Sequence, residues 1–295
     1  NDNCIHECID HAFTAIINAI NDRKDPPEWP DLIPEQHRSA LERIQRLPEL
    51  INSFSQIARS FTDDQRSSFL AIFSQSNNVG SLLDGTGVIP PALEEMAVLV
   101  EAAKAVCNEG YALLGRMSYR KDHYTIIYNS ILHKVCPFCG MEPFDPPALL
   151  SEDEDHYLAR NHYPLAAANM RNLVPMGGKC NQRYKGRVDI LRKQNVRRKA
   201  LDPYGSVSVD LNLINSNPSN GHQCKPDWNL QFTPQTEEVT TWIDTFDIIE
   251  RLRIGVFDQF YDDWISEIAT WFQLIGLHNG SDDRAILNAL EQFAV

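Results

Sequence analysis

Hydrophobic positions recur with helical spacing over most of the chain. Pro-rich stretches such as "DPPEWPDLIP" separate the periodic segments. From Glu237 to the end, Trp, Phe and Ile recur at helical spacing, and we expect these aromatic side chains to lie in a core. Apolar residues three and four positions apart predict further helices over about 5–20, 39–61, 63–75 and 92–133.

The middle of the chain has a different texture. Short segments rich in Pro, Gly, Asn, His and Cys fill 136–190, and two alternating apolar runs within 205–233 predict a strand pair. We therefore expect an α+β protein that is mainly α. Its predicted parts are a helical N-terminal region (1–130), a central unit (131–200), and a strand pair followed by a helical C-terminal region (201–295).

Composition narrows the class of protein. No stretch approaches the ~18 apolar residues that span a bilayer, so we expect no membrane association. The N-terminal segment "NDNCIHECIDHAFTAIINAIND" has no basic segment before it and no small-residue cleavage site, unlike a signal peptide. Seven cysteines, odd in number and unevenly spread, do not fit a disulfide framework. These features favour a reducing, cytoplasmic location.

Charge is distributed very unevenly. The net charge of -13 argues against a protein that coats nucleic acid through bulk electrostatics. Between Lys179 and Lys199, however, nine Lys or Arg residues stand beside one acid, Asp189, which leaves 18 bases and 39 acids elsewhere. Such a run is often only a solvated helix face, and the alternative is a surface that contacts phosphates.

The segment "CPFCG" carries two cysteines at the spacing of a zinc knuckle. Cys136 and Cys139 also match the redox motif of thioredoxin-like proteins, which follows a strand and opens a helix. Here "GMEPFDPP" follows, and its Gly and three prolines cannot open a helix. The residues that follow Cys139 therefore favour a zinc site over a redox motif.

Four motifs follow one another between about 133 and 190. They are the Cys136/Cys139 pair, the Asp155-His156 pair, "NLVP" beginning at Asn172, and Cys180-Asn181 followed by Lys185-Gly186. Their order resembles that of HNH endonucleases of the ββα-metal (treble-clef) type. The resemblance implies a hairpin whose first strand ends in Asp155 and His156. It also implies that Asn172 on the second strand steadies the loop presenting the base, and that Asn181 opens the following helix.

The chemistry of phosphodiester hydrolysis explains why these residue types belong together. The reaction needs a base to activate water and positive charge on the phosphoryl oxygens and the departing 3′ oxygen. His156, neutral near pH 7, is the candidate general base. A hard cation such as Mg²⁺ or Mn²⁺ prefers oxygen ligands, which the Asp155 carboxylate and the Asn181 amide can supply.

Basic residues follow the predicted metal ligand on the same helix. Asn181 and Lys185 are four residues apart and share a face, with Arg183 and Arg187 nearby. This placement favours substrate phosphate contacts by Arg183, Lys185 and Arg187 over a merely solvated face. The distance from Asn181 to the final Lys is one residue longer than the commonest family pattern.

The zinc ligands are incomplete by comparison with the family. Gly177 stands where the family pattern has the first cysteine of a second pair, so only Cys136, Cys139 and Cys180 remain. We expect a structural Zn²⁺ with Cys224 as fourth ligand; His222 or water are alternatives. A further alternative is that hydrophobic packing holds the unit together without zinc.

We therefore expect a metal-dependent HNH endonuclease acting on DNA. By analogy with the family, it would work with a partner, such as an ATPase or target-recognition subunit, in prokaryotic anti-phage defence or restriction. RNA is not distinguished from DNA by these residues. The alternative, from another class, is a zinc-stabilised nucleic-acid-binding or adaptor protein with an inactive centre. The trio of Asp155, His156 and Asn181 argues against it, because a scaffold has no need of those side chains.

Overall fold

The chain forms two compact units in the computed structural model. The first comprises Asn1–Ser208 and Gln235–Phe246, and the second comprises Val209–Pro234 and Asp247–Val295. Helices predominate and the strands form small two-stranded sheets, which confirms the expected mainly helical α+β class. The predicted N-terminal region and central unit both belong to the first compact unit. The structure describes residues 3–91, 94–149, 154–217, 226–276, 282, 284–286 and 288.

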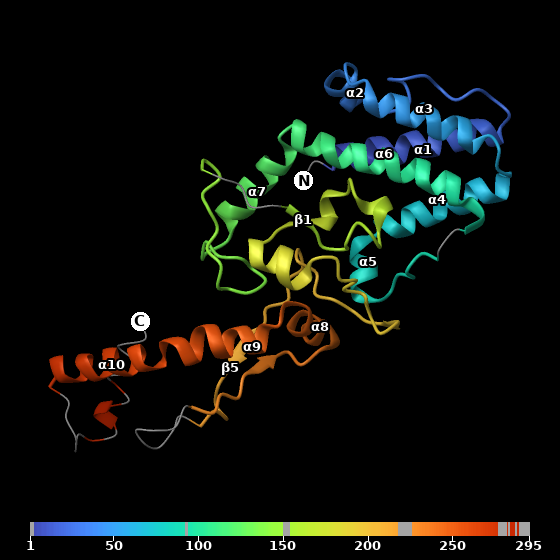
Figure 1. Cartoon of the computed structure of the whole chain (residues 1–295). Helices are drawn as coiled ribbons and strands as arrows, with labels where there is room; N and C mark the ends of the chain where they lie inside the picture. The colour runs from blue at the N-terminus through green and yellow to red at the C-terminus, as the bar shows by residue number, and fades with distance from the viewer. Residues whose placement is uncertain are drawn as a thin grey trace. The chain divides into compact units, whose positions relative to one another are not determined.

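Helices make up most of the first unit (Figure 1). The helix predicted over 39–61 is interrupted, and the one predicted over 92–133 breaks at Met117 and Ser118, where Ser118 has a φ of 64°. The helices are α1 (Cys4–Asn21), α2 (Glu35–Leu41), α3 (Arg46–Ala58), α4 (Asp63–Asn77), α5 (Val79–Asp84), α6 (Ala97–Arg116), α7 (Tyr119–Ser130) and α8 (Glu237–Phe246), with a short η1 (Glu94–Met96).

The core of this unit lies where α1, α3, α4 and α6 meet. Phe13 of α1 packs on Phe54 of α3 with ring centroids 4.2 Å apart, and on Phe73 of α4 at 5.1 Å. A capping box between Thr62 and Gln65 fixes the start of α4. The helical spacing of the apolar residues thus produces one continuous buried face on each helix.

Gly110 lets α6 approach α1 and the segment that precedes β2. A Cβ at this position would lie 2.6 Å from the Ile9 Cδ1 and 2.9 Å from the Ala168 Cβ. No side chain larger than hydrogen fits there unless these neighbours move. The close approach brings the C-terminal half of α6 next to the predicted site.

The central unit contains the expected hairpin followed by a helical turn. Strand β1 (Glu154–His156) pairs antiparallel with β2 (Leu173–Pro175), with Asp155 opposite Val174. The turn η4 (Cys180–Lys185) is wound as a π-helix, because Gly186 N donates to the Asn181 carbonyl five residues earlier. A π-turn contains one residue more than an α-turn. Two short helices, η2 (Pro164–Ala166) and η3 (Met170–Asn172), connect the strands, and β3 (Arg192–Lys193) pairs with β4 (Val196–Arg197).

The second unit contains the predicted strand pair and the last helices. Strands β5 (Asp210–Asn212) and β6 (Gln231–Thr233) pair antiparallel, as predicted. Helices α9 (Ile248–Leu252), η5 (Arg253–Phe257) and α10 (Asp258–Leu274) follow.

The prediction that the C-terminal aromatic side chains form a core holds only in part. Phe246 is 1% exposed and Phe257 is 8% exposed, but Phe260 and Trp264 of α10 are 39% and 37% exposed. Helical spacing predicts an apolar face without determining what covers it. Among the described helices, none combines the length and apolar content that a membrane crossing requires.

Candidate active site and metal centre

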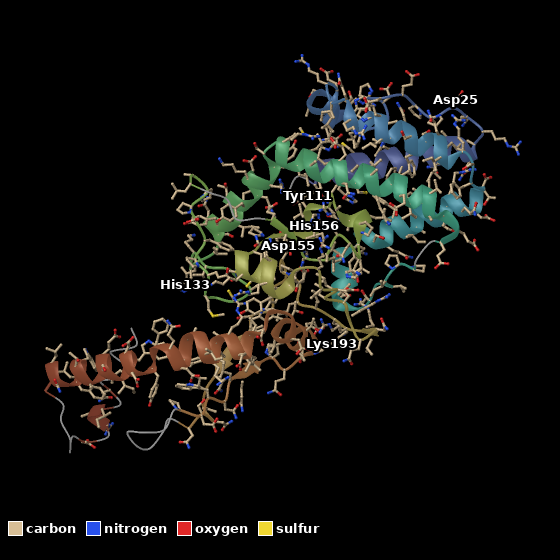
Figure 2. All side chains as sticks on the ribbon, viewed as in Figure 1. Asp25, Tyr111, His133, Asp155, His156 and Lys193 are labelled. Carbon is tan, nitrogen blue, oxygen red and sulfur yellow. The ribbon has the colours of Figure 1, made fainter. Side chains whose placement is uncertain are left out.

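Asp155 and His156 line one cavity of about 490 Å³. Figure 2 labels both residues. Neighbours on a regular strand point to opposite faces. Here both residues of the pair nevertheless line the cavity, from the last two positions of β1. Asn108, Arg160 and Arg187 also line the cavity.

His156 is positioned with one ring nitrogen committed to the backbone. Its Nε2 lies 2.9 Å from the Ala167 carbonyl oxygen, which can only accept a hydrogen bond. Nε2 therefore carries the hydrogen, and Nδ1 is the nitrogen that can accept a proton. Burial lowers the pKa of His156 to about 4, and the nearby charges of Arg160, Lys185 and Arg120 act in the same direction. The imidazole is consequently neutral around pH 7.

Asp155 is paired with a buried lysine. Lys185 Nζ donates to Asp155 Oδ2 at 2.6 Å and to the His156 carbonyl at 2.6 Å. Lys185 is fully buried, and this burial lowers its pKa, opposed by the charge of Asp155. Lys185 thus holds the end of β1 from inside, which differs from the substrate contact expected from the sequence.

Asn172 steadies the loop after β1. Its Oδ1 accepts from Leu158 N at 2.7 Å, and its Nδ2 donates to the Leu158 carbonyl at 3.1 Å. Asn172 is fully buried and lies immediately before β2, at the end of η3. These contacts are structural in character and fit the role that the resemblance implies.

The structure does not bring every predicted site residue to the cavity. Asn181 is half-buried on η4, and it is not among the described residues that line the cavity with Asp155. Arg183 and Arg187 are exposed, and of these two Arg187 lines the cavity. The geometry therefore favours Asp155 over Asn181 as the protein ligand of a catalytic cation.

Residues of α6 and α7 complete the site and were not predicted from the sequence. The ring centroids of Tyr111 and His156 lie 4.5 Å apart. Arg120 Nη1 donates a hydrogen bond to the Tyr111 hydroxyl at 2.8 Å. The Arg160 guanidinium lies 5.5 Å from the same ring. Arg160 follows His156 by four residues, so its place in the sequence could have identified it as a candidate site residue. Tyr111 and Asn108 have no local signal because tertiary packing brings α6 to the hairpin.

A buried polar network supports β1 at Glu154. The Glu154 carboxylate contacts His123 Nδ1, and His123 Nε2 lies 3.1 Å from the Tyr204 hydroxyl. Tyr204 in turn donates to the Leu173 carbonyl of β2. Burial raises the pKa of Glu154, and the interaction with His123 opposes this shift. The network connects α7 with both strands of the hairpin.

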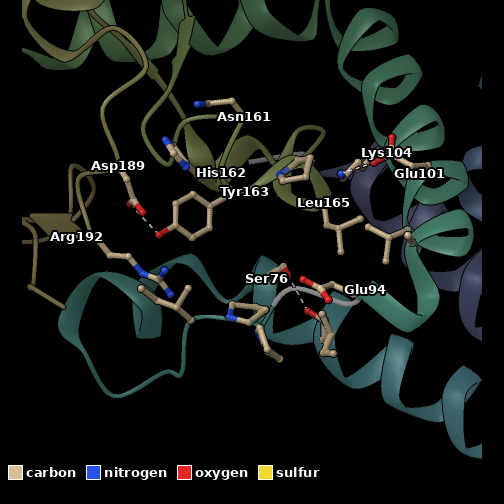
Figure 3. Close-up of a pocket in the computed structure, with 17 residues that line it drawn as sticks. Ser76, Glu94, Glu101, Lys104, Asn161, His162, Tyr163, Leu165, Asp189 and Arg192 are labelled. Atoms are coloured by element: carbon tan, nitrogen blue, oxygen red, sulfur yellow. Dashed lines mark hydrogen bonds and ion pairs between the residues drawn. The ribbon is translucent and has the colours of Figure 1, made fainter. Parts of the chain in front are cut away.

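A second cavity of about 460 Å³ adjoins the first, and Figure 3 shows the side chains that line it. Asn161 and Pro164 line both cavities. Carboxylates of Glu94 and Glu101 line the second cavity, and Glu101 is paired with Lys104 at 2.6 Å. Acidic groups oppose phosphate binding, so the cavity at His156 is the better candidate for a nucleic-acid backbone.

Three cysteines from two distant segments form a compact buried cluster. The Sγ atoms of Cys136, Cys139 and Cys180 all lie within 4.8 Å of one another. Hydrogen bonds from Cys136 and Cys180 lower the pKa of the Cys139 thiol, which favours a thiolate. Soft thiolates at this spacing suit zinc. Cys224, the expected fourth ligand, and His222 lie outside the described residues.

The local chain conformation builds the cluster. Gly140 takes a φ of +66° and its N–H donates to the Cys136 carbonyl at 2.8 Å, which closes the knuckle. Gly177 N donates to Cys136 Sγ at 3.3 Å. Phe138 between the two cysteines packs on Phe246 with ring centroids 5.0 Å apart, so α8 covers the knuckle.

Comparison with known proteins identifies no relative of this chain. No family model matches the chain, and searches of the curated proteins and of the solved structures find no match. Function is therefore inferred from the sequence motifs and from the geometry of the two sites.

Proposed function

We propose that the protein is a metal-dependent HNH endonuclease that hydrolyses phosphodiester bonds of DNA. The observation that carries the proposal is the meeting of Asp155, His156 and two arginines, Arg160 and Arg187, in one cavity. A neutral imidazole, a carboxylate and cationic groups are what phosphodiester hydrolysis requires at one place.

His156 acts as the general base through Nδ1. The hydrogen bond from Nε2 to the Ala167 carbonyl fixes the tautomer and the orientation of the ring. When Nδ1 accepts the proton of water, the hydrogen bond to Ala167 stabilises the imidazolium that forms. Tyr111 holds the ring from one face.

Asp155 supplies the carboxylate for a hard cation. A carboxylate can accept from Lys185 and still offer oxygen lone pairs to a metal ion. Mg²⁺ commonly uses one or two carboxylates together with water and substrate phosphate oxygens, so the donor set fits the ion. Bound Mg²⁺ or Mn²⁺ would supply positive charge to the phosphoryl oxygens and the departing 3′ oxygen.

Arg160 and Arg187 are proposed to contact the DNA backbone. Both are exposed and line the cavity, although they are 27 residues apart in the sequence. The acidic remainder of the chain weakens autonomous binding to nucleic acid. We therefore propose a protein partner, such as an ATPase or target-recognition subunit, and a role in anti-phage defence or restriction.

The proposal is tested by removing the metal ligand. Asp155→Asn should lower plasmid cleavage in Mg²⁺ or Mn²⁺ by about two orders of magnitude or more, because the carboxylate charge is lost. Asp25→Asn is the matched control, since Asp25 lies at the surface with a 94% exposed side chain (Figure 2). Equal cleavage by wild type and Asp155→Asn would refute the proposed role of Asp155.

The contact with the DNA backbone has its own test. Arg160→Ala and Arg187→Ala should each weaken DNA binding and reduce the slope of log K against log salt by about one. Arg43→Ala is the control, because Arg43 is 95% exposed on the helical region. Fluorescence anisotropy without divalent metal measures binding alone, and unchanged slopes in both variants would exclude these contacts.

One observation favours the alternative of an inactive adaptor. Asp155 is engaged by a fully buried lysine, and Asn181 is not among the described residues lining its cavity. A centre held in this way could bind nucleic acid without cutting it. Binding without cleavage by a folded, zinc-loaded wild type supplied with Mg²⁺ and Mn²⁺ would support this alternative.

A further inference from the structure

The carboxylate of Glu142 lies beside the cysteine cluster, and it was not among the ligands expected from the sequence. Glu142 follows Cys139 by three residues, and its Oε1 lies 3.8 Å from Cys139 Sγ. A tetrahedral zinc site with Zn–S of about 2.3 Å and Zn–O of about 2.1 Å places sulphur and oxygen ligands about 3.6 Å apart. The separation from Cys139 is therefore close to that between two ligands of one zinc ion, while the three sulphur atoms alone form the group in which every ligand atom lies within 4.8 Å of the others.

Glu142 also occupies the space of the missing cysteine. A Cβ built at Gly177 would lie 2.8 Å from Glu142 Oε2 and 3.0 Å from Glu142 Cβ. A cysteine at position 177 would therefore require the Glu142 side chain to move. The glycine at 177 is what allows the carboxylate to reach the cluster.

The backbone holds the carboxylate in place. Lys179 N donates to Glu142 Oε2 at 2.8 Å, and Cys180 N donates to Glu142 Oε1 at 3.2 Å. Cys136 N donates to the Glu142 carbonyl at 2.7 Å, which ties the residue to the knuckle. These contacts join Glu142 to segments that carry Cys136 and Cys180.

We propose that the Glu142 carboxylate is the fourth ligand of a structural zinc ion held by Cys136, Cys139 and Cys180. Zinc accepts carboxylate oxygen as well as thiolate, and a carboxylate contributes the same charge as the cysteine that it replaces. The site does not depend on the proposed nuclease activity, because it would be the same in an adaptor. It differs from the ligand set predicted from the sequence, which included Cys224.

X-ray absorption at the zinc edge of the wild-type protein gives the first test. Three sulphur ligands and one oxygen ligand are expected, whereas four sulphur ligands would overturn the proposal in favour of a fourth cysteine. This measurement needs no variant, so it does not depend on the folding of a mutant.

Two variants then separate Glu142 from water and from Cys224. In competition with a chelating dye, Glu142→Ala should bind Zn²⁺ at least about 10-fold more weakly, and Cys224→Ser should match the wild type. The visible spectrum of the Co²⁺-substituted protein should change in Glu142→Ala alone. Wild-type zinc affinity and Co²⁺ spectrum in Glu142→Ala, or loss of zinc in Cys224→Ser alone, would overturn the proposal.

A rescue variant covers the case in which Glu142→Ala does not fold. Adding Gly177→Cys to Glu142→Ala supplies a thiol in the volume that the carboxylate leaves, and should restore zinc binding with four sulphur ligands. A folded double variant that binds zinc through only three sulphur atoms would contradict the shared location of the two ligands.

Discussion

His156 illustrates how single residues acquire their properties from the surrounding fold. The sequence supplies an imidazole next to a carboxylate, and the fold makes it neutral by burying it to 6% exposure. The fold also determines which ring nitrogen is protonated. Nε2 carries the hydrogen because it donates a hydrogen bond to the Ala167 carbonyl. Lys185 shows the converse: a basic residue expected to contact substrate phosphate is fully buried against Asp155.

The low pKa of His156 predicts a pH dependence of stability. The unfolded chain takes up a proton near the ordinary value of 6.5 and the folded chain only near 4, so the unfolded state binds more protons between these values. Stability contributed by the neutral ring is present above about pH 6.5 and is lost as the pH falls towards 4. The slope from this group is up to about 1.4 kcal/mol per pH unit.

Urea unfolding between pH 7 and 4 measures this effect. The difference in unfolding free energy between wild type and His156→Ala should narrow as the pH falls, whereas His133→Ala, at an exposed position, should follow the wild type. A constant difference over this range would show that His156 is not held neutral by burial.

At the scale of elements, the features that local motifs determine could be predicted from the sequence, and those that depend on long-range packing could not. The positions of β1, β2 and the knuckle follow from short motifs whose ligands or turns are close in sequence. Tyr111, His123 and Arg120 could not be predicted as site residues, because only the packing of α6 and α7 against the hairpin brings them there.

The close contact between α6 and α1 at Gly110 leads to a prediction about stability. Gly110→Ala should destabilise the protein by about 1–3 kcal/mol, because the Ala168 Cβ stands 2.9 Å from the added methyl group and belongs to a short, rigid side chain. Gly80→Ala in α5 is the control. Apart from its chain neighbours and its own helix backbone, no atom lies within 4 Å of the added methyl group, so the substitution should stabilise the helix by up to about 1 kcal/mol. Equal effects of the two substitutions on urea unfolding would contradict the close approach described for Gly110.

At the scale of the whole molecule, basic residues are concentrated in one segment of an acidic chain. Nine bases and one acid lie between Lys179 and Lys199, although the chain as a whole carries a net charge of -13. Such a distribution favours phosphate contact at one place and repels nucleic acid elsewhere. This is the physical reason for proposing a partner that brings the nuclease centre to its substrate.

The most direct measurement is plasmid cleavage by wild type, His156→Ala and His133→Ala, prepared identically and with zinc content determined on the same samples. Both histidines belong to the central unit, and the His133 side chain is exposed (Figure 2). We predict cleavage in Mg²⁺ or Mn²⁺ by wild type and His133→Ala, and a loss of about 100-fold or more in His156→Ala. Cleavage by His156→Ala at the wild-type rate would contradict a nuclease that uses His156 as its base.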